Sequence, residues 1–250
     1  MNIITTQKAL QELVEYYSEC DAFAFDVETT GDHRGDPRRN NVVWISLATD
    51  GRTDVIPMGH PNGEYLRTEY PLLNSGSLRM EKGLEVRPQD YSKDDRKAVR
   101  IFDEPPAQLT PAEVFSALKP LLKSDKVKVG HNLKFDLQSV TKYIKELPEK
   151  PYFCTLNAAF IHNNRDRNSL GLDDCLKREF GYEMVKGVGK EVEKYSFSEV
   201  AEYSALDAEW TWKLYKKLYE ELHKEGLLGI FTLEMDVLEV ICNMELRGAD

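Results

Sequence analysis

Apolar residues along the chain alternate between helical and strand-like spacing. Between Thr6 and Cys20 they recur at positions i, i+3, i+4 and i+7, which is typical of an amphipathic helix. The run 42–48 is apolar throughout, as expected of a strand buried on both faces, and Asp50-Gly51 just after it predicts a hairpin turn. The first quarter of the chain is therefore predicted to contain a strand at 3–4, a helix at 6–20, a strand at 22–25 and a hairpin of 42–48 with 54–57.

Capping signals define the helices of the second half of the chain. Thr110 with Glu113, and Ser196 with Glu199, have the spacing of a capping box, and Gly181 is a typical residue after the end of a helix. The predicted elements are a helix at 110–122, a strand at 126–130, a helix entered at 132–136, helices at 155–161 and 172–180, a long helix at 196–225 and a last helix at 228–246. This alternation predicts an α/β fold, a mixed β-sheet flanked by helices.

Residues 59–109 interrupt this pattern. They are rich in charged residues of both signs and contain few apolar residues at any regular spacing. Long segments of this kind are either functional or poorly ordered. We therefore interpret 59–109 as a solvated excursion inserted into the domain.

Composition excludes several classes of protein. The 250 residues carry a net charge of −10, with 41% hydrophobic and 30% charged residues, which is typical of a globular chain and argues against wrapping nucleic acid by charge alone. No apolar run is long enough to span a bilayer, so no membrane partner is expected. The N-terminus lacks a signal peptide, and the 4 cysteines form no C-x-x-C pair, so we expect a reducing, cytoplasmic compartment.

Two carboxylates follow the apolar strand at 22–25. Side chains alternate between the faces of a strand, so Asp26 and Glu28 are expected to point the same way, with Val27 directed into the core. Two adjacent carboxylates repel each other unless a cation neutralises them, which makes the pair a candidate site for a hard metal ion. An exposed turn after a strand explains a lone D-x-E equally well.

Two further motifs come later in the chain. Asn132 and Asp136 lie where the strand at 126–130 leads into a helix, and an acidic residue there also complements the helix dipole. Tyr203 and Asp207 are four residues apart in the long helix, so their side chains lie on one face. Such pairs also occur by chance on solvated helices.

The order of the three motifs is more informative than any one of them. A strand ending in D-x-E, then N-x-x-x-D after a later strand, then Y-x-x-x-D on a helix resembles the DEDD superfamily of exonucleases in its tyrosine-bearing form. The resemblance runs over about residues 3–226, apart from the excursion. It implies a ribonuclease H-like fold and 3′→5′ exonuclease activity.

The C-terminal residues narrow the resemblance further. The stretches 231–238 and 244–250 look like the entry into the polymerase domain of family A (Pol I-like) DNA polymerases. We therefore expect a proofreading domain at 1–226 and the first helix of a polymerase domain at 227–250. The polymerase domain would lie in the same, longer chain. The initiator Met close to the first strand suggests that no 5′-nuclease domain precedes it, as in many phage polymerases.

The resemblance implies roles for the motif residues. Two divalent cations, Mg²⁺ or Mn²⁺, would bind where the single-stranded 3′ end of DNA arrives. Asp26 would bridge both cations, Glu28 and Asp207 would complete one site, and Asp136 would hold the second. Tyr203 would orient the attacking water. The products would be nucleoside 5′-monophosphates.

Substrate contacts are also expected from the resemblance. Thr29 would reach the 3′ end, while Asn132 and Phe135 would face the terminal nucleotides. Tyr182 would stack on a base, or simply pack beside Phe180. Loop arginines at 34, 38 and 39, and Arg165 and Arg167, are candidates for phosphate contacts. The apolar wedge that many relatives carry after D-x-E is replaced here by Gly31-Asp32-His33.

The motifs leave two alternative functions open. One is a free-standing, RNase D-like 3′-5′ exonuclease that trims RNA, because the motifs do not distinguish the sugars. The other is a non-catalytic module that binds single strands. The polymerase-like C-terminus argues against the first, and the presence of all four carboxylates and the tyrosine argues against the second.

Overall fold

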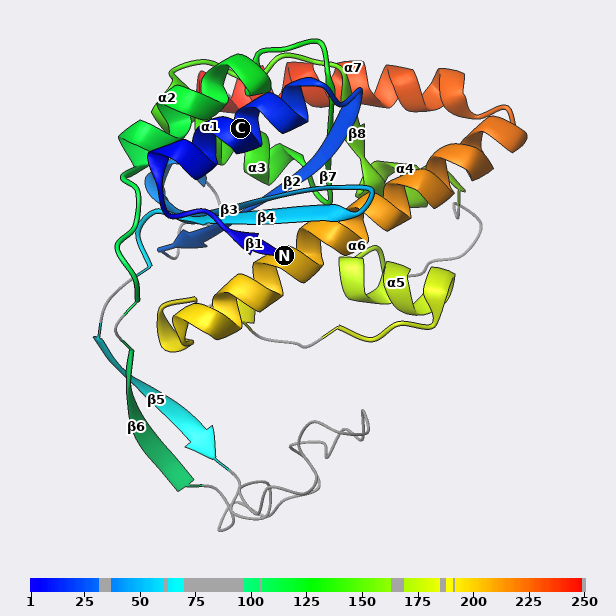
Figure 1. Cartoon of the computed structure of the whole chain (residues 1–250). Coiled ribbons are helices and arrows are strands. Elements are labelled where there is room, and N and C mark those ends of the chain that lie inside the picture. The colour runs from blue at the N-terminus through cyan, green and yellow to red at the C-terminus, as the bar shows by residue number, and fades with distance from the viewer. Residues whose placement is uncertain are drawn as a thin grey trace.

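The computed structural model of the chain consists of a six-stranded sheet with helices packed on both faces (Figure 1). It describes residues 1–31, 37–60, 63–69, 97–103, 105–162, 169–184, 188–190 and 192–248. A two-stranded ribbon projects from one end of this body. Within the described part of the chain, no helix has the length and apolarity that a bilayer crossing requires.

The sheet is mixed, as the sequence predicts. In spatial order the strands are β1 (Asn2–Ile3), β4 (Arg52–Pro57), β3 (Asn41–Thr49), β2 (Ala22–Thr30), β7 (Val127–Gly130) and β8 (Tyr152–Cys154). Strands β2, β3 and β4 form an antiparallel meander. β1 pairs with β4 in parallel, and β7 and β8 extend the other edge in parallel, so β2 lies between β3 and β7.

The helices divide between the two faces of the sheet. The described helices are α1 (Gln7–Ser18), α2 (Pro111–Leu122), α3 (Lys134–Ile144), α4 (Thr155–His162), α5 (Leu172–Phe180), α6 (Phe197–Lys224) and α7 (Leu228–Leu246), with 3-10 turns η1 (Pro37–Arg39), η5 (Val188–Lys190) and η6 (Val192–Lys194). The long helix α6 packs across β2, β3 and β4, and α4 and α5 pack against α6. On the other face α1 packs on α2 and α2 on α3, and α7 lies against α3, α4 and β8.

The capping signals are confirmed. Both capping boxes form, with the hydroxyl of Thr110 accepting from the amide of Glu113 and that of Ser196 from the amide of Glu199. Gly181 ends α5 in the left-handed conformation, at φ 67°. These caps fix where α2, α5 and α6 begin or end.

Three strands were not predicted. β8 is only three residues long, too short to display an alternating pattern. β5 (Gly63–Glu69) and β6 (Lys97–Asp103) pair as an antiparallel ribbon within the excursion at 59–109. In the sequence, charged residues interrupt the apolar ones in both strands, so no regular alternation reveals them.

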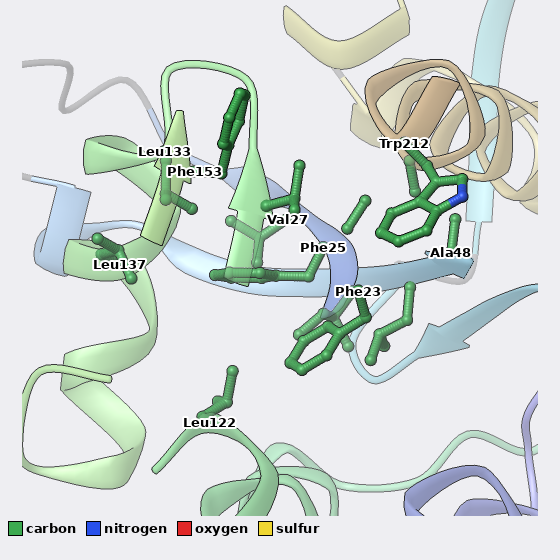
Figure 2. Packing of buried hydrophobic residues seen from close by; sticks show 14 of the residues in the cluster. Phe23, Phe25, Val27, Ala48, Leu122, Leu133, Leu137, Phe153 and Trp212 are labelled. Atoms are coloured by element: carbon green, nitrogen blue, oxygen red, sulfur yellow. The ribbon is translucent and has the colours of Figure 1, made fainter. Parts of the chain in front are cut away.

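The hydrophobic core fixes β2 from both sides. Figure 2 shows Phe23, Phe25 and Val27 of this strand among side chains from the opposing helices, including Leu137 of α3 and Trp212 of α6. A second cluster fills the space between β3, β4 and the first turns of α6, and η5 and η6 contribute Val188 and Val192 to it. A strand held this tightly provides a rigid base for the polar side chains at its end.

Candidate metal centre

The carboxyl end of β2 presents two acids on one side of the sheet. Val27 is buried in the core, while Asp26 and Glu28 project from the opposite face, as strand alternation predicts. The pairing with β3 shifts register between Glu28 and Thr29. The Glu28 side chain is only 5% exposed.

Helix α6 brings the third acid to this point. Tyr203 and Ser204 are adjacent in α6, and Asp207 lies one turn further on. The Ser204 hydroxyl donates to Glu28 Oε1 at 3.4 Å. Asp207 is 9% exposed. Since α6 packs directly on β2 and β3, its buried face meets the end of β2.

Carboxylates from β2 and α6 converge into one cluster. One oxygen from each of Asp26, Glu28 and Asp207 lies within 4.8 Å of the other two. Asp207 Oδ1 is buried and has no hydrogen-bond partner among the described residues. A buried carboxylate oxygen without a donor is costly unless a cation satisfies it, so this all-oxygen set fits a hard divalent ion.

Asp136 reaches the same region from α3. Its Oδ1 accepts from the amide of Val27 at 3.1 Å, so it lies beside the strand that carries Asp26 and Glu28. The turn before α3 depends on Asn132, which has φ 58°, a left-handed conformation that Asn tolerates better than most residues. Asn132 therefore has a backbone role in directing Asp136 into the site.

The four acids oppose one another's ionisation. Burial raises the pKa of Glu28 to about 8, with added repulsion from Asp207 and Asp136. Burial also raises the pKa of Asp207 to about 7, against a lowering by hydrogen bonding from Tyr203. Burial also raises the pKa values of Asp26 and Asp136. Among the neighbouring charges, Asp136 raises the pKa of Asp26 most. Such repulsion is what a bound cation relieves.

Tyr203 stays protonated in this setting. Burial raises the pKa of its phenol, and the negative charges of Asp207 and Glu28 raise it further. A phenol that holds its proton can donate a hydrogen bond but cannot serve as a base at neutral pH. The motif tyrosine therefore faces the acidic cluster as a donor.

Two neighbours of the cluster were missed by sequence reasoning. Ser204 donates to Glu28, and Gly189 of η5 lies directly against Tyr203 and Glu28. Ser204 could have been found, because it stands inside the Y-x-x-x-D motif on a buried helix face. Gly189 stands in the Gly-Val-Gly-Lys stretch at 187–190 of the sequence, but the sequence alone gives no sign of how close Gly189 comes to Tyr203.

The predicted substrate contacts come from several elements of the structure. Thr29 and Phe135 are half-buried, and Asn132 is exposed. Tyr182 stacks on Trp210, with ring centroids 4.1 Å apart, and not on Phe180. Arg34, Arg165 and Arg167 lie outside the described residues, as do Asp32 and His33 of the segment that replaces the apolar wedge.

Two other polar groups near the motifs have protein partners. Arg38 Nη1 donates to the carbonyl of Leu246 at 2.8 Å, which ties η1 to the end of α7. His131 bonds Thr155 Oγ1 and the carbonyl of Leu170, both at 2.9 Å, and burial lowers its pKa to about 4. A neutral, fully bonded histidine fits a structural role, as expected of a polar residue at the end of a strand.

Comparisons with known proteins identify relatives of this chain. A family model described as 3′-5′ exonuclease matches residues 96–223, which include Asp136, Tyr203 and Asp207 and begin after Asp26 and Glu28. DNA polymerase I of Chloroflexus aurantiacus is 24% identical over 257 residues, a match that covers 99% of this chain and 22% of the relative. The chain thus spans about a fifth of the length of that relative.

Solved structures share the fold. Escherichia coli RNase D, an exoribonuclease, superposes with a TM-score of 0.66 at 18% identity, covering 97% of this chain and 51% of that one. Brucella melitensis NrnC with bound Mg²⁺ gives a TM-score of 0.62 at 19% identity, covering 99% and 92%. The mixed sheet flanked by helices is therefore the exonuclease fold that the sequence motifs predict.

Proposed function

The chain belongs to the 3′-5′ exonuclease family of A-type DNA polymerases, and on that premise we propose that it proofreads DNA by hydrolysing the 3′-terminal phosphodiester. The products would be nucleoside 5′-monophosphates and a strand shorter by one residue. The observation that supports this most directly is the convergence of the Asp26, Glu28 and Asp207 carboxylates within 4.8 Å.

The acidic cluster would hold divalent cations, Mg²⁺ or Mn²⁺. Asp26, Glu28 and Asp207 would bind one ion, and Asp136 together with Asp26 would bind a second. The Oδ1 atom of Asp207, which has no hydrogen-bond partner in the described part of the chain, supports this assignment. A donor set made only of oxygen supports it too. When bound, a pair of such ions activates a water molecule and neutralises charge on the departing 3′ oxygen.

Tyr203 would position the attacking water. Its raised pKa keeps the phenol protonated, so it would orient the water by hydrogen bonding and would not remove its proton. Ser204 would hold the Glu28 carboxylate in place through the bond to Oε1. With a tyrosine one turn from Asp207, this set of acids would form an active site of the tyrosine-bearing type.

The substrate contacts remain as the sequence predicts them. Thr29, Asn132 and Phe135 would meet the last nucleotides, and Tyr182 would stack on a base from its position against Trp210. Arg165 and Arg167 would contact phosphates. The partner is the single-stranded 3′ end of DNA.

Release of mononucleotides from a 3′-labelled single strand tests the proposal. Asp207→Ala should reduce the rate by at least about 100-fold, more than the loss of an outer partner of a metal ligand typically costs. EDTA should abolish activity in the unaltered chain. Asp174→Ala, an exposed acid on neighbouring α5, is the matched control and should keep full activity. Undiminished hydrolysis by Asp207→Ala would contradict the assignment.

A second candidate substrate is RNA. The structural likeness to RNase D favours it, because that neighbour is an exoribonuclease. Rates on DNA and RNA single strands of matched sequence separate the two readings. We expect the DNA strand to be degraded faster, and a clear preference for RNA would support the second candidate.

We also propose that α7 belongs to a polymerase domain that follows the exonuclease domain at about residue 226. One face of α7 packs on the core, but the opposite face exposes a continuous apolar stripe in this structure. An exposed stripe of this size marks an interaction surface. The stripe consists of Ile230, Leu233, Val237, Val240, Ile241 and Met244.

A further inference from the structure

Gly189 occupies a position where a side chain would collide with the candidate site. A Cβ built there would lie 2.9 Å from the Tyr203 hydroxyl oxygen, 3.1 Å from Tyr203 Cε1 and 3.3 Å from Glu28 Oε2. The first distance is shorter than carbon and oxygen atoms tolerate without a bond. Gly189 has no left-handed φ, so the backbone itself would accept alanine and the only conflict is one of space.

The turn that carries Gly189 has little freedom to move away. Val188 is 5% exposed and Val192 is fully buried, and both pack into the cluster around Trp44 and Phe197. Shifting η5 by the few tenths of an ångström that a Cβ requires would open this packed cluster. The ring of Tyr203 and the carboxylate of Glu28 would therefore move first.

We propose that Gly189 is a positioning residue, whose missing side chain lets η5 fix the places of the Tyr203 hydroxyl and the Glu28 carboxylate. This inference rests on the proposed exonuclease function, because it assigns the consequence to the attacking water and the cation. The physical reason is that groups acting on the reacting atoms must be held in place, since a misplacement of about 1 Å can cost about 100-fold in rate.

The Gly189→Ala variant tests the proposal. Its kcat for mononucleotide release should fall by about 10- to 100-fold, with KM changed less than about threefold, because the displaced groups act on the reacting atoms. The melting temperature should stay within about 2 °C of the unaltered chain, since the collision involves the ends of side chains. Gly229→Ala is the matched control, because a Cβ at Gly229 meets no atom of the described residues within 4 Å, and its kcat should be unchanged.

A double variant separates positioning from general damage. Tyr203→Phe removes the oxygen that the new Cβ would approach most closely, so Gly189→Ala should lower kcat by less than about threefold when added to Tyr203→Phe. A full additional loss of 10-fold or more in that background, measured at saturating Mn²⁺ so that weaker cation binding through Glu28 does not lower the rate, would overturn the proposal. A melting temperature reduced by many degrees in Gly189→Ala would also overturn it, because the effect would then be structural.

Calorimetric titration with Mn²⁺ provides a readout that does not depend on activity. Displacement of Glu28 should weaken Mn²⁺ binding severalfold in Gly189→Ala and leave it unchanged in Gly229→Ala. If the unaltered chain binds Mn²⁺ but releases no mononucleotides, the proposed function fails while the titration still decides the role of Gly189. Unaltered kcat and Mn²⁺ affinity in Gly189→Ala would overturn the inference and leave the proposed function intact.

Discussion

The carboxyl groups of Glu28 and Asp207 are buried close to other acids, so their charged forms are unfavourable without a cation nearby. Burial and mutual repulsion raise their pKa values to about 8 and about 7. In an unfolded chain the same groups have pKa values of roughly 4. The folded, metal-free protein therefore retains protons near neutral pH that the unfolded chain has already lost.

This difference predicts how stability depends on pH. Because the folded pKa values are raised, their contribution to stability is fully present below about pH 4 and is lost as pH rises through about 7 and 8. In EDTA the melting temperature should fall by several degrees between pH 6 and pH 8.5, and Asp207→Asn should reduce this fall. Differential scanning calorimetry measures it.

Saturating Mg²⁺ supplies the control for this prediction. A cation bound among the carboxylates favours their charged forms, so the decline with pH should become smaller when Mg²⁺ is present. A metal-free melting temperature that stays constant or rises over the same pH range would contradict the picture of a repulsive acidic cluster.

The sequence predicts the positions of some site residues and not of others. The common direction of Asp26 and Glu28 follows from strand alternation, and the shared face of Tyr203 and Asp207 from helix spacing. The closeness of Gly189 to Tyr203 depends on how η5 is anchored by distant core residues, which no local pattern encodes. Tyr182 was expected to stack on a base or pack beside Phe180, and its contact with Trp210 required the tertiary structure.

At the scale of elements, the end of α7 braces the start of α3. Glu245 accepts from Lys134 Nζ at 2.7 Å and from Gln138 Nε2 at 2.6 Å, and Asp136 lies between these two donors in the chain. Lys134 is 38% exposed at its side chain, so this ion pair contributes little. Gln138 is 4% exposed, and its amide depends more on the bond.

Removal of this brace should weaken the fold measurably. Glu245→Ala deprives the buried Gln138 amide of an acceptor and should lower the free energy of unfolding by about 1 kcal/mol. Urea denaturation measures the change. Glu234→Ala, on the same helix, is the matched control and should stay within about 0.5 kcal/mol of the unaltered chain. Equal stability of both variants would mean that the contact is not a brace.

The elements themselves were largely predictable, for identifiable reasons. Helices with a capping box or a terminal glycine, such as α2, α5 and α6, were placed to within a few residues, because their ends have local causes. β8 was not predicted, because a strand of three residues is too short to show an alternating pattern of apolar and polar residues. The β5–β6 ribbon was not predicted, because its strands pair with each other and not with the main sheet.

At the scale of the whole molecule, the exposed apolar stripe on α7 is expected to be buried against another protein surface. Leu233 is 61% exposed on this stripe, so the isolated chain should self-associate at micromolar concentration. Leu233→Glu should weaken that association by about tenfold or more, since burying a leucine is worth roughly 1.5–3 kcal/mol. Analytical ultracentrifugation measures the change.

A neighbouring polar position provides the control for this prediction. Thr232→Glu adds the same charge at an exposed site of α7 without removing apolar surface, and it should leave self-association nearly unchanged. An unaltered chain that remains monomeric at high concentration would contradict the idea that this face packs against a further domain.

Segments far apart in the chain bring their acids together, and we propose that these acids bind catalytic metal ions. A crystal soaked with Mn²⁺ and a nucleoside 5′-monophosphate tests it most directly, through the anomalous signal of the metal. We predict density within coordination distance of Asp26, Glu28 and Asp207, and a second peak beside Asp136. Mn²⁺ bound elsewhere, with these four carboxylates left without a ligand, would contradict the account.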